Sequence, residues 1–401
     1  MNSVLRYLGP RPYTQAEARH FAGRSEQATA LISLLGIHRV VRLQGESGVG
    51  KTSLANAAIT PLLQRDGADV LPCVRLAPLL PMPASVTGNP LLWRIFVGWC
   101  GDPQEASQWM KLGLARYLAD RPKPSGFGVL PSLRVIVLDE GAGFPSSMPQ
   151  QHLAELANQL QAAMAEDSLL RILHIADIPS AAGASRTIGV PLDAGAAFTL
   201  DPLTRAEALA SVHQLAGAAN VEITAEAASK LVGDLVTTKL RSAGTRVERI
   251  GEQVDPVHLQ LAWRGAIRAL HTGDTVVRMD HVAQVSEETL QLDTFCEEAV
   301  QHAAEAAGLS TQDLMRWIAH EFVDREGARM AVPGEGGFLR GLPYTAAEAL
   351  ATEGLLVKYV VAATDWFELG HDRLAPVIRA LGEVAPQVPP VEAQPAQTSA
   401  P

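Results

Sequence analysis

Short apolar runs separated by segments with helical spacing form the pattern of the first half of the chain. Residues 133–138 (LRVIVL) and 171–177 (RILHIAD) are apolar runs, and residues 37–43 and 70–76 have a similar character. Such runs are typical of parallel strands that are buried on both faces of a sheet. Residues 151–165, between two of these runs, have the spacing of a helix. The alternation predicts an α/β fold with a doubly wound parallel sheet.

Helical spacing also marks residues 15–35 and residues 52–67, the second of which follows a group of glycines. Pro61 lies inside the second segment. Because proline has no backbone N–H to donate, we expect Pro61 to bend or end that helix.

The pattern changes in the second half of the chain, where strand signals stop and residues 204–290 are helical. Residues 293–325 predict two or three short helices. Residues 354–360 and 365–370 then predict paired strands, and residues 373–381 predict a final helix. Helices followed by a small β-hairpin and another helix predict a winged-helix module.

Length and composition fit a folded protein of two or three domains. The chain has 401 residues, of which 47% are apolar and 19% are charged, and its net charge is −10. An acidic chain is poorly suited to coating nucleic acid or an anionic membrane. Its three cysteines, Cys73, Cys100 and Cys296, have no zinc-site spacing. With no signal peptide and no apolar run of about 20 residues, we expect a soluble, cytoplasmic protein that does not contact a membrane.

The strongest motif is a phosphate-binding loop, Gly45-Glu46-Ser47-Gly48-Val49-Gly50-Lys51-Thr52, which matches G-x-x-x-x-G-K-[ST]. It follows a predicted strand and opens a predicted helix. Its glycines let successive N–H groups point at one anion, and the helix N-terminus adds positive charge. Lys51 is expected to reach the β- and γ-phosphates of ATP or ADP, and Thr52 to bind Mg²⁺. We include the next residue, Ser53, in the nucleotide-binding segment.

An acidic pair, Asp139-Glu140, stands at the end of the predicted strand 133–138. The carboxyl end of this strand shares a sheet edge with the phosphate loop, so Asp139 is expected to hold Mg²⁺, directly or through water. Glu140 is a candidate for orienting or activating the attacking water. Lys51 and Glu140 are therefore the two candidate catalytic residues.

Several motifs, in order along the chain, resemble the STAND class of signal-transduction P-loop ATPases, in particular its bacterial novel STAND type. Besides the phosphate loop and Asp139, they are YLGPRPY at 7–13, FAGRSE at 21–26, FTLDPLT at 198–204, DPVHLQL at 255–261 and WFELGHDRL at 366–374. The resemblance implies four parts: a P-loop NTPase core with its N-terminal signature (1–200), a helical lid (201–288), a winged-helix domain (289–383) and a proline-rich tail (384–401). We expect the tail to be disordered, because little in it could pack.

Members of this class are switches, and the resemblance implies a resting state in which ADP is clamped between core, lid and winged helix. Exchange of ADP for ATP then allows protomers to assemble. Gly23 and Arg24 would lie near the base and ribose, Pro256 near the adenine, and His371 at the β-phosphate of ADP. The implied cofactors are Mg²⁺ and ATP or ADP. The implied partners are a separate sensor or effector protein and, in the ATP state, further copies of the chain, whereas nucleic acid is not expected.

These residues also have structural interpretations. Arg24 could be a solvated cation, Pro256 could simply begin a helix at its first turn, and His371 could be a packing residue. Asp372 is expected to be the N-cap of the final helix.

Two departures from the family pattern concern hydrolysis. The family arginine at the end of the fourth core strand is missing from residues 173–179 (LHIADIP), and the family's DQFEE segment reads DEGAGF from Asp139 onward. We therefore expect a weak ATPase, and a nucleotide-binding scaffold without hydrolysis remains an alternative. A DNA-binding regulator is the other alternative, although the arginines of the predicted lid and winged helix are scattered.

Overall fold

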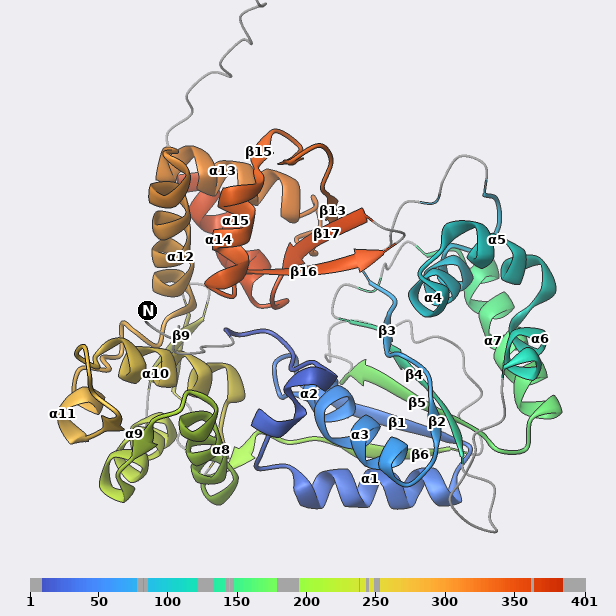
Figure 1. Ribbon diagram of the computed structural model, residues 1–401, viewed down its shortest axis with the longest axis horizontal. Helices are drawn as coiled ribbons and strands as arrows, with labels where there is room; N and C mark the ends of the chain where they lie inside the picture. The colour runs from blue at the N-terminus through green and yellow to red at the C-terminus, as the bar shows by residue number, and fades with distance from the viewer. Residues whose placement is uncertain are drawn as a thin grey trace, which may run out of the picture.

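The computed structural model describes residues 9–77, 82, 86–121, 133–141, 144, 148–178, 195–237, 239–242, 245–248, 253–361 and 364–384. Figure 1 shows three groups of elements: a sheet with its helices, a group of helices that follows it in the chain, and a C-terminal group above both. We call them the core (residues 9–200), the helical region (201–288) and the C-terminal unit (292–384). All of the predicted tail except Val384 lies outside the described residues.

The core is built on a parallel sheet, as the apolar runs predict. The strand order is β2-β4-β5-β1-β6, and β3 also pairs with β4. The strands are β1 (Val40–Gly45), β2 (Asp69–Val70), β3 (Val74–Arg75), β4 (Arg134–Asp139), β5 (Leu170–Asp177) and β6 (Ala196–Thr199). The prediction of one strand over 70–76 is wrong in detail, because the segment forms two short strands. Pro72, which cannot donate to the ladder, lies between them.

Helices cover both faces of this sheet, which explains why its strands are apolar on both sides. One face carries α1 (Ser25–Ile37), α2 (Lys51–Leu54) and α3 (Thr60–Arg65), and the other carries α4 (Pro90–Cys100), α5 (Pro103–Leu112), α6 (Leu114–Asp120) and α7 (Gln150–Glu166). In β4, Val135 and Val137 pack on the first face, and Ile136 and Leu138 on the second.

Two helical predictions are refined by the structure. Of the two outcomes predicted for Pro61, a bend or an end of the helix, the end is excluded, because a π-helical turn, η2 (Ala55–Ile59), precedes Pro61 and the chain continues as α3 to Arg65. Residues 15–35 are not one helix, because the 3₁₀ helix η1 (Gln15–His20) is separated from α1 at Gly23. Gly23 has a φ of +80° and packs against the helix that begins at residue 205, where a Cβ would lie 2.5 Å from the carbonyl oxygen of Glu207.

The helical region contains α8 (Arg205–Ala218), α9 (Ala225–Thr237), α10 (Pro256–Arg268) and α11 (Met279–Val282). Thr204 and Glu207 form a capping box at the start of α8, and Asp255 caps α10. Strands do not stop here, contrary to the prediction. Short pairs join β7 (Leu203–Thr204) to β11 (Gln253–Val254), β8 (Glu222–Ile223) to β12 (Val276–Val277), and β9 (Lys239–Ser242) to β10 (Thr245–Glu248).

The C-terminal unit contains the predicted helices and paired strands. Two helices, α12 (Leu292–Ala307) and α13 (Thr311–Phe322), precede α14 (Tyr344–Thr352) and α15 (Leu374–Val384). A three-stranded antiparallel sheet has the order β13 (Val332–Pro333), β17 (Thr364–Leu369), β16 (Leu356–Val361), and β14 (Phe338–Leu339) pairs with β15 (Leu342–Pro343). None of the helices in the described part of the chain is long and apolar enough to cross a membrane.

The helical region and the C-terminal unit share one continuous hydrophobic cluster, in which Trp263 of α10 and Phe295 of α12 are fully buried. Ion pairs also join the two parts. Arg264 and Arg268 of α10 both pair with Glu298 and Glu353, at 2.6–3.2 Å. The two parts are therefore joined by a buried apolar interface and by ion pairs.

Arg264→Ala is expected to lower stability by about 2 kcal/mol, because a nearly buried cation between two partly exposed glutamates is lost. Arg268→Ala removes the more exposed arginine from the same glutamates and is the matched control, with an expected loss below about 1 kcal/mol. The side chains are 5% and 38% exposed, respectively. Thermal unfolding of both variants tests this, and equal losses would contradict a buried joint between the two parts.

Candidate functional site

The phosphate loop lies between the end of β1 and the start of α2. Gly48 and Gly50 have φ values of +88° and +98°, a backbone conformation that favours glycine. The loop therefore turns sharply, and α2 begins at Lys51 directly after Gly50. Its backbone is thus arranged as the motif requires, with a helix N-terminus facing the carboxyl edge of the sheet.

Lys51 is nearly buried, and its ammonium group contacts three oxygen atoms. Nζ donates to the carbonyl oxygens of Gly45 and Glu46, each at 2.9 Å, and lies 2.7 Å from Oδ1 of Asp177. Asp177 ends β5 and is in register with Gly45. The structure thus places a carboxylate beside the loop lysine, within the segment 173–179 that lacks the family arginine.

Thr52 and Asp139 form the expected pair. The hydroxyl of Thr52 donates to Oδ2 of Asp139 at 2.7 Å, and the backbone N–H of Gly141 donates to Oδ1 at 3.0 Å. A hydroxyl and a carboxylate at this distance are oxygen donors of the kind that Mg²⁺ prefers. The chemistry of the two residues therefore fits a magnesium ion beside the phosphate loop.

A cavity beside the phosphate loop is lined by all three parts of the molecule. The core contributes residues 47–53, Arg75, Asp139 and Asp177, the helical region contributes Pro256, Val257 and Gln260, and the C-terminal unit contributes Gly370, His371 and Asp372. The structure thus brings together residues that are far apart in sequence, from Pro10 to Asp372.

One end of the cavity is walled by the N-terminal segment. The hydroxyl of Tyr13 accepts a hydrogen bond from Gln260 at 2.9 Å, and its ring packs edge-on against Phe21. Burial raises the pKa of Tyr13 to about 12, partly offset by the bond from Gln260. Pro256 begins α10 at its first turn and also lines the cavity. Tyr13, Phe21 and Pro256 thus give this part of the cavity an apolar lining.

Arg24 is buried and is not a solvated cation. Its guanidinium donates to the carbonyl oxygens of Val49 and Asp201, at 3.2 and 2.7 Å, and lies 3.8 Å from Glu207. It therefore fixes the phosphate loop to the start of the helical region. Gly23 is not among the residues that line the cavity, and its close approach to α8 accounts for the glycine.

His371 lies on the cavity, and its ring is held in one tautomer. Nδ1 accepts a hydrogen bond from the backbone N–H of Arg373 at 3.0 Å, so the proton of the neutral ring is assigned to Nε2. Burial lowers the pKa of His371 to about 4, an effect that Asp372 opposes and Arg373 reinforces. At neutral pH the ring is therefore an uncharged donor.

Asp372 has a different role from the one its position predicts. Its carboxylate does not provide a cap to α15 but pairs with Arg75 of the core at 3.1 Å and with Arg329 of its own unit at 2.5 Å. Both arginines also approach Glu368 of β17, at 3.6 and 3.7 Å. The N-cap prediction is wrong because two arginines attract this carboxylate more strongly than a helix N-terminus does.

Arg373 is a site residue that the sequence reasoning missed. One of its terminal nitrogens donates to the carbonyl oxygen of Ser47 in the phosphate loop, and the other to Asp255, each at 2.7 Å. Asp255 is the residue that caps α10. The motif His371-Asp372-Arg373 therefore contacts the phosphate loop, β3 and the helical region.

Comparison with known proteins decides the family. The family model described as Novel STAND NTPase 1 matches residues 7–245, more than half of the chain. This protein belongs to the novel STAND NTPase family. A comparison with curated proteins found no match.

Solved structures similar to this STAND NTPase have low sequence identity to it. The Orc1 protein of Aeropyrum pernix, solved in complex with DNA, is 16% identical with a TM-score of 0.42, covering 91% of this chain and 93% of that one. Cdc6p of Pyrobaculum aerophilum is 15% identical with a TM-score of 0.43, covering 90% and 94%. The Walker-type ATPase of Pyrococcus abyssi is 16% identical with a TM-score of 0.41, covering 93% and 100%.

Glu140 of the STAND NTPase is not among the described residues that line the cavity. Its side chain is nearly buried, and Oε1 lies 3.0 Å from Nε2 of the fully buried His174 on β5. Glu140 is therefore one residue past the cavity wall at Asp139, in contact with the neighbouring strand.

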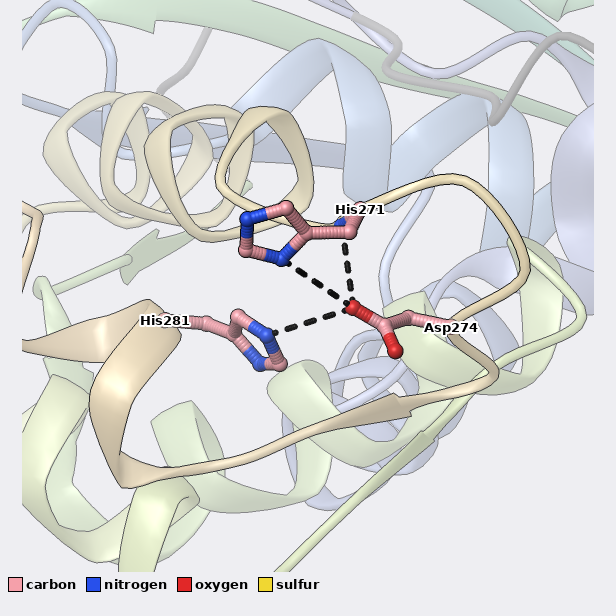
Figure 2. Close-up of side chains that lie close together, drawn as sticks. All are labelled: His271, Asp274 and His281. Carbon is pink, nitrogen blue, oxygen red and sulfur yellow. Dashed lines mark hydrogen bonds and ion pairs between the residues drawn. The ribbon is translucent and has the colours of Figure 1, made fainter.

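A second cluster of titratable groups, His271, Asp274 and His281, lies in the helical region of the STAND NTPase (Figure 2). One oxygen of Asp274 lies 3.5 Å from Nδ1 of His271 and 3.5 Å from Nε2 of His281. However, Nδ1 of His281 accepts a hydrogen bond from the backbone N–H of Arg278 at 3.0 Å. The proton of the neutral ring is thus on Nε2 and faces Asp274, which makes this ring a helix cap and not a free metal ligand.

Lowering the pH from 7 to 5 is expected to weaken the arrangement around His371. Its pKa in the folded protein, about 4, is below the ordinary 6.5, so the folded state resists protonation. The stability contributed by the neutral ring is fully present above about pH 6.5 and is lost as the pH falls toward 4. The loss amounts to roughly 1–2 kcal/mol by pH 5.

Thermal unfolding at the two pH values measures this effect. His371→Asn keeps an acceptor close to the place of Nδ1 but does not titrate, so its unfolding midpoint should fall less between pH 7 and pH 5 than that of the wild type. The same fall in both proteins would show that His371 contributes nothing to the pH dependence.

Proposed function

We propose that this STAND NTPase is a nucleotide-dependent switch that binds ADP or ATP with Mg²⁺ and is held closed by its C-terminal unit. The observation that carries the proposal is the placement of His371, Asp372 and Arg373. Arg373 contacts the phosphate loop and Asp255 of the helical region, Asp372 pairs with Arg75 of the core, and His371 lines the cavity. A change at the phosphates is therefore transmitted to all three parts of the chain at once.

In this proposal the nucleotide lies along the cavity. Its phosphates take the N–H groups of residues 45–52 and the ammonium of Lys51, and Mg²⁺ takes Thr52 and Asp139. The adenine lies against Tyr13, Phe21 and Pro256, with Arg24 holding the loop beneath it. The uncharged His371 donates from Nε2 to the β-phosphate, which is possible because Nδ1 is already occupied.

The proposed switch divides the chain as the sequence predicts, with residues 1–200 as the core, 201–288 as the lid and 289–383 as the winged-helix domain. A trigger supplied by a separate sensor or effector protein would loosen ADP, and ATP-bound copies of the chain would then assemble. Glu140 could serve hydrolysis only after its carboxylate leaves His174 and turns toward Asp139. This requirement fits a weak ATPase.

The alternative of a DNA-binding regulator is disfavoured by the partners of the arginines. Arg264 and Arg268 pair with glutamates, Arg316 pairs with Asp313, and Arg340 pairs with Glu321. Cations that are already paired with carboxylates add little to the binding of a phosphate backbone.

Lys51→Ala is expected to abolish most of the stabilisation by nucleotide. A ligand present at 100 times its Kd stabilises the native state by about 2.7 kcal/mol, and the variant lacks the ammonium that reaches the phosphates. Thermal unfolding with and without Mg²⁺ and ADP measures the effect. Lys230→Ala on the surface of α9 is the control, and an equal ligand shift in Lys51→Ala and the wild type would overturn the site.

Arg373→Ala is expected to speed the release of ADP at least about tenfold, because two charge-assisted hydrogen bonds that close the cavity are lost. Release of a fluorescent ADP derivative after mixing with excess ADP gives the rate. Arg379→Ala is the matched control, since Arg379 lies on α15, which begins directly after Arg373, and pairs with the exposed Glu383. Equal release from the two variants would show that Arg373 does not close the site.

A further inference from the structure

We propose that Asp177 sets the nucleotide preference of this site, favouring nucleoside diphosphates over triphosphates. The inference rests on the proposed function, because it concerns the same cavity. It comes from the contact between the carboxylate of Asp177 and the ammonium of Lys51, at 2.7 Å.

The sheet places Asp177 at the edge where β1 leads into the phosphate loop, beside Lys51. β5 lies next to β1, and Asp177 is in register with Gly45, the first residue of the phosphate loop. The loop N–H groups hold the α- and β-phosphates, and the lysine reaches from the β- to the γ-phosphate. Asp177 also lines the cavity together with Asp139. A γ-phosphate near Lys51 therefore lies close to this carboxylate.

The hydrogen bonds of Lys51 make the competition direct. All three N–H donors of an ammonium group are accounted for by Gly45, Glu46 and Asp177. Lys51 must therefore give up a partner before it can donate to a phosphate. When it turns away from Asp177, the carboxylate loses the one cation that the described structure places in contact with it.

The arginines that line the cavity do not compensate Asp177. Arg75 pairs with Asp372, Arg11 pairs with Glu17, and Arg24 lies beside Glu207. Asp139 differs from Asp177, because Thr52 and Gly141 donate to it and a magnesium ion would neutralise it. The additional negative charge of ATP thus meets an uncompensated carboxylate, whereas ADP places less charge at that position.

The test compares the Kd values of Mg²⁺·ADP and Mg²⁺·ATPγS by isothermal titration calorimetry for the wild type and Asp177→Asn. Asparagine keeps the size and an acceptor oxygen but removes the charge. We expect the ratio of the Kd for ATPγS to the Kd for ADP to fall at least about fivefold, in keeping with the loss of one partly exposed like charge near a phosphate. Thermal unfolding without ligand verifies that the variant is folded, and Asp177→Ala should change the ratio in the same direction.

Asp120→Asn is the matched control, because Asp120 also pairs with one cation and has a similar exposure, 40% against 36%, but is remote from the cavity lining. In Asp120→Asn the ratio of the Kd for ATPγS to the Kd for ADP should equal that of the wild type. An unchanged ratio in Asp177→Asn, or weaker binding of ATPγS, overturns the inference while leaving nucleotide binding intact. If the wild type binds neither nucleotide, the proposed function and this inference both fail.

Discussion

The guanidinium group of Arg373 is the contact on which the arrangement around the cavity depends. It joins the carbonyl oxygen of Ser47 to the carboxylate of Asp255, and so connects the phosphate loop with the start of α10. Burial alone would raise the pKa of Asp255, but hydrogen bonding by His258 and the charge of Arg373 lower it well below its usual range. The carboxylate therefore stays charged over the physiological pH range. Asp255 also caps α10, the helix whose first residue, Pro256, lines the cavity.

The two interfaces of the C-terminal unit differ in chemistry, and this difference predicts which one opens. Its interface with the helical region is part of one apolar cluster around Trp263 and Phe295, which would be costly to expose. Its interface with the core is mainly charged, with Arg75, Asp372 and Arg373, and has a smaller apolar contact where Trp366 and Tyr359 reach the α4 side of the core. Water can replace the polar contacts, so we expect separation from the core while the helical region stays attached.

The sequence was sufficient for the fold of the core and for the phosphate loop, because both depend on local patterns. Apolar runs mark β4 and β5, and glycine spacing with a lysine marks the loop. The sequence was insufficient where the role of a residue depends on partners that are distant in the sequence. Asp372 looks like a helix cap until Arg75 and Arg329 are placed beside it, and Arg373 shows its importance only when Ser47 and Asp255 converge on it. Glu140 likewise follows Asp139 in sequence, yet its carboxylate pairs with His174 on the neighbouring strand.

The central claim, that the nucleotide controls the position of the C-terminal unit against the core, is tested most directly by a distance measurement. Spin labels on bioorthogonal side chains at the exposed positions Gln104 of α5 and Gln312 of α13 report this position by pulsed electron paramagnetic resonance. Saturating Mg²⁺·ADP should give one narrow distance distribution, and saturating Mg²⁺·ATPγS should give a longer or broader one. Identical distributions with both nucleotides, under conditions where calorimetry shows both to be bound, would contradict the account.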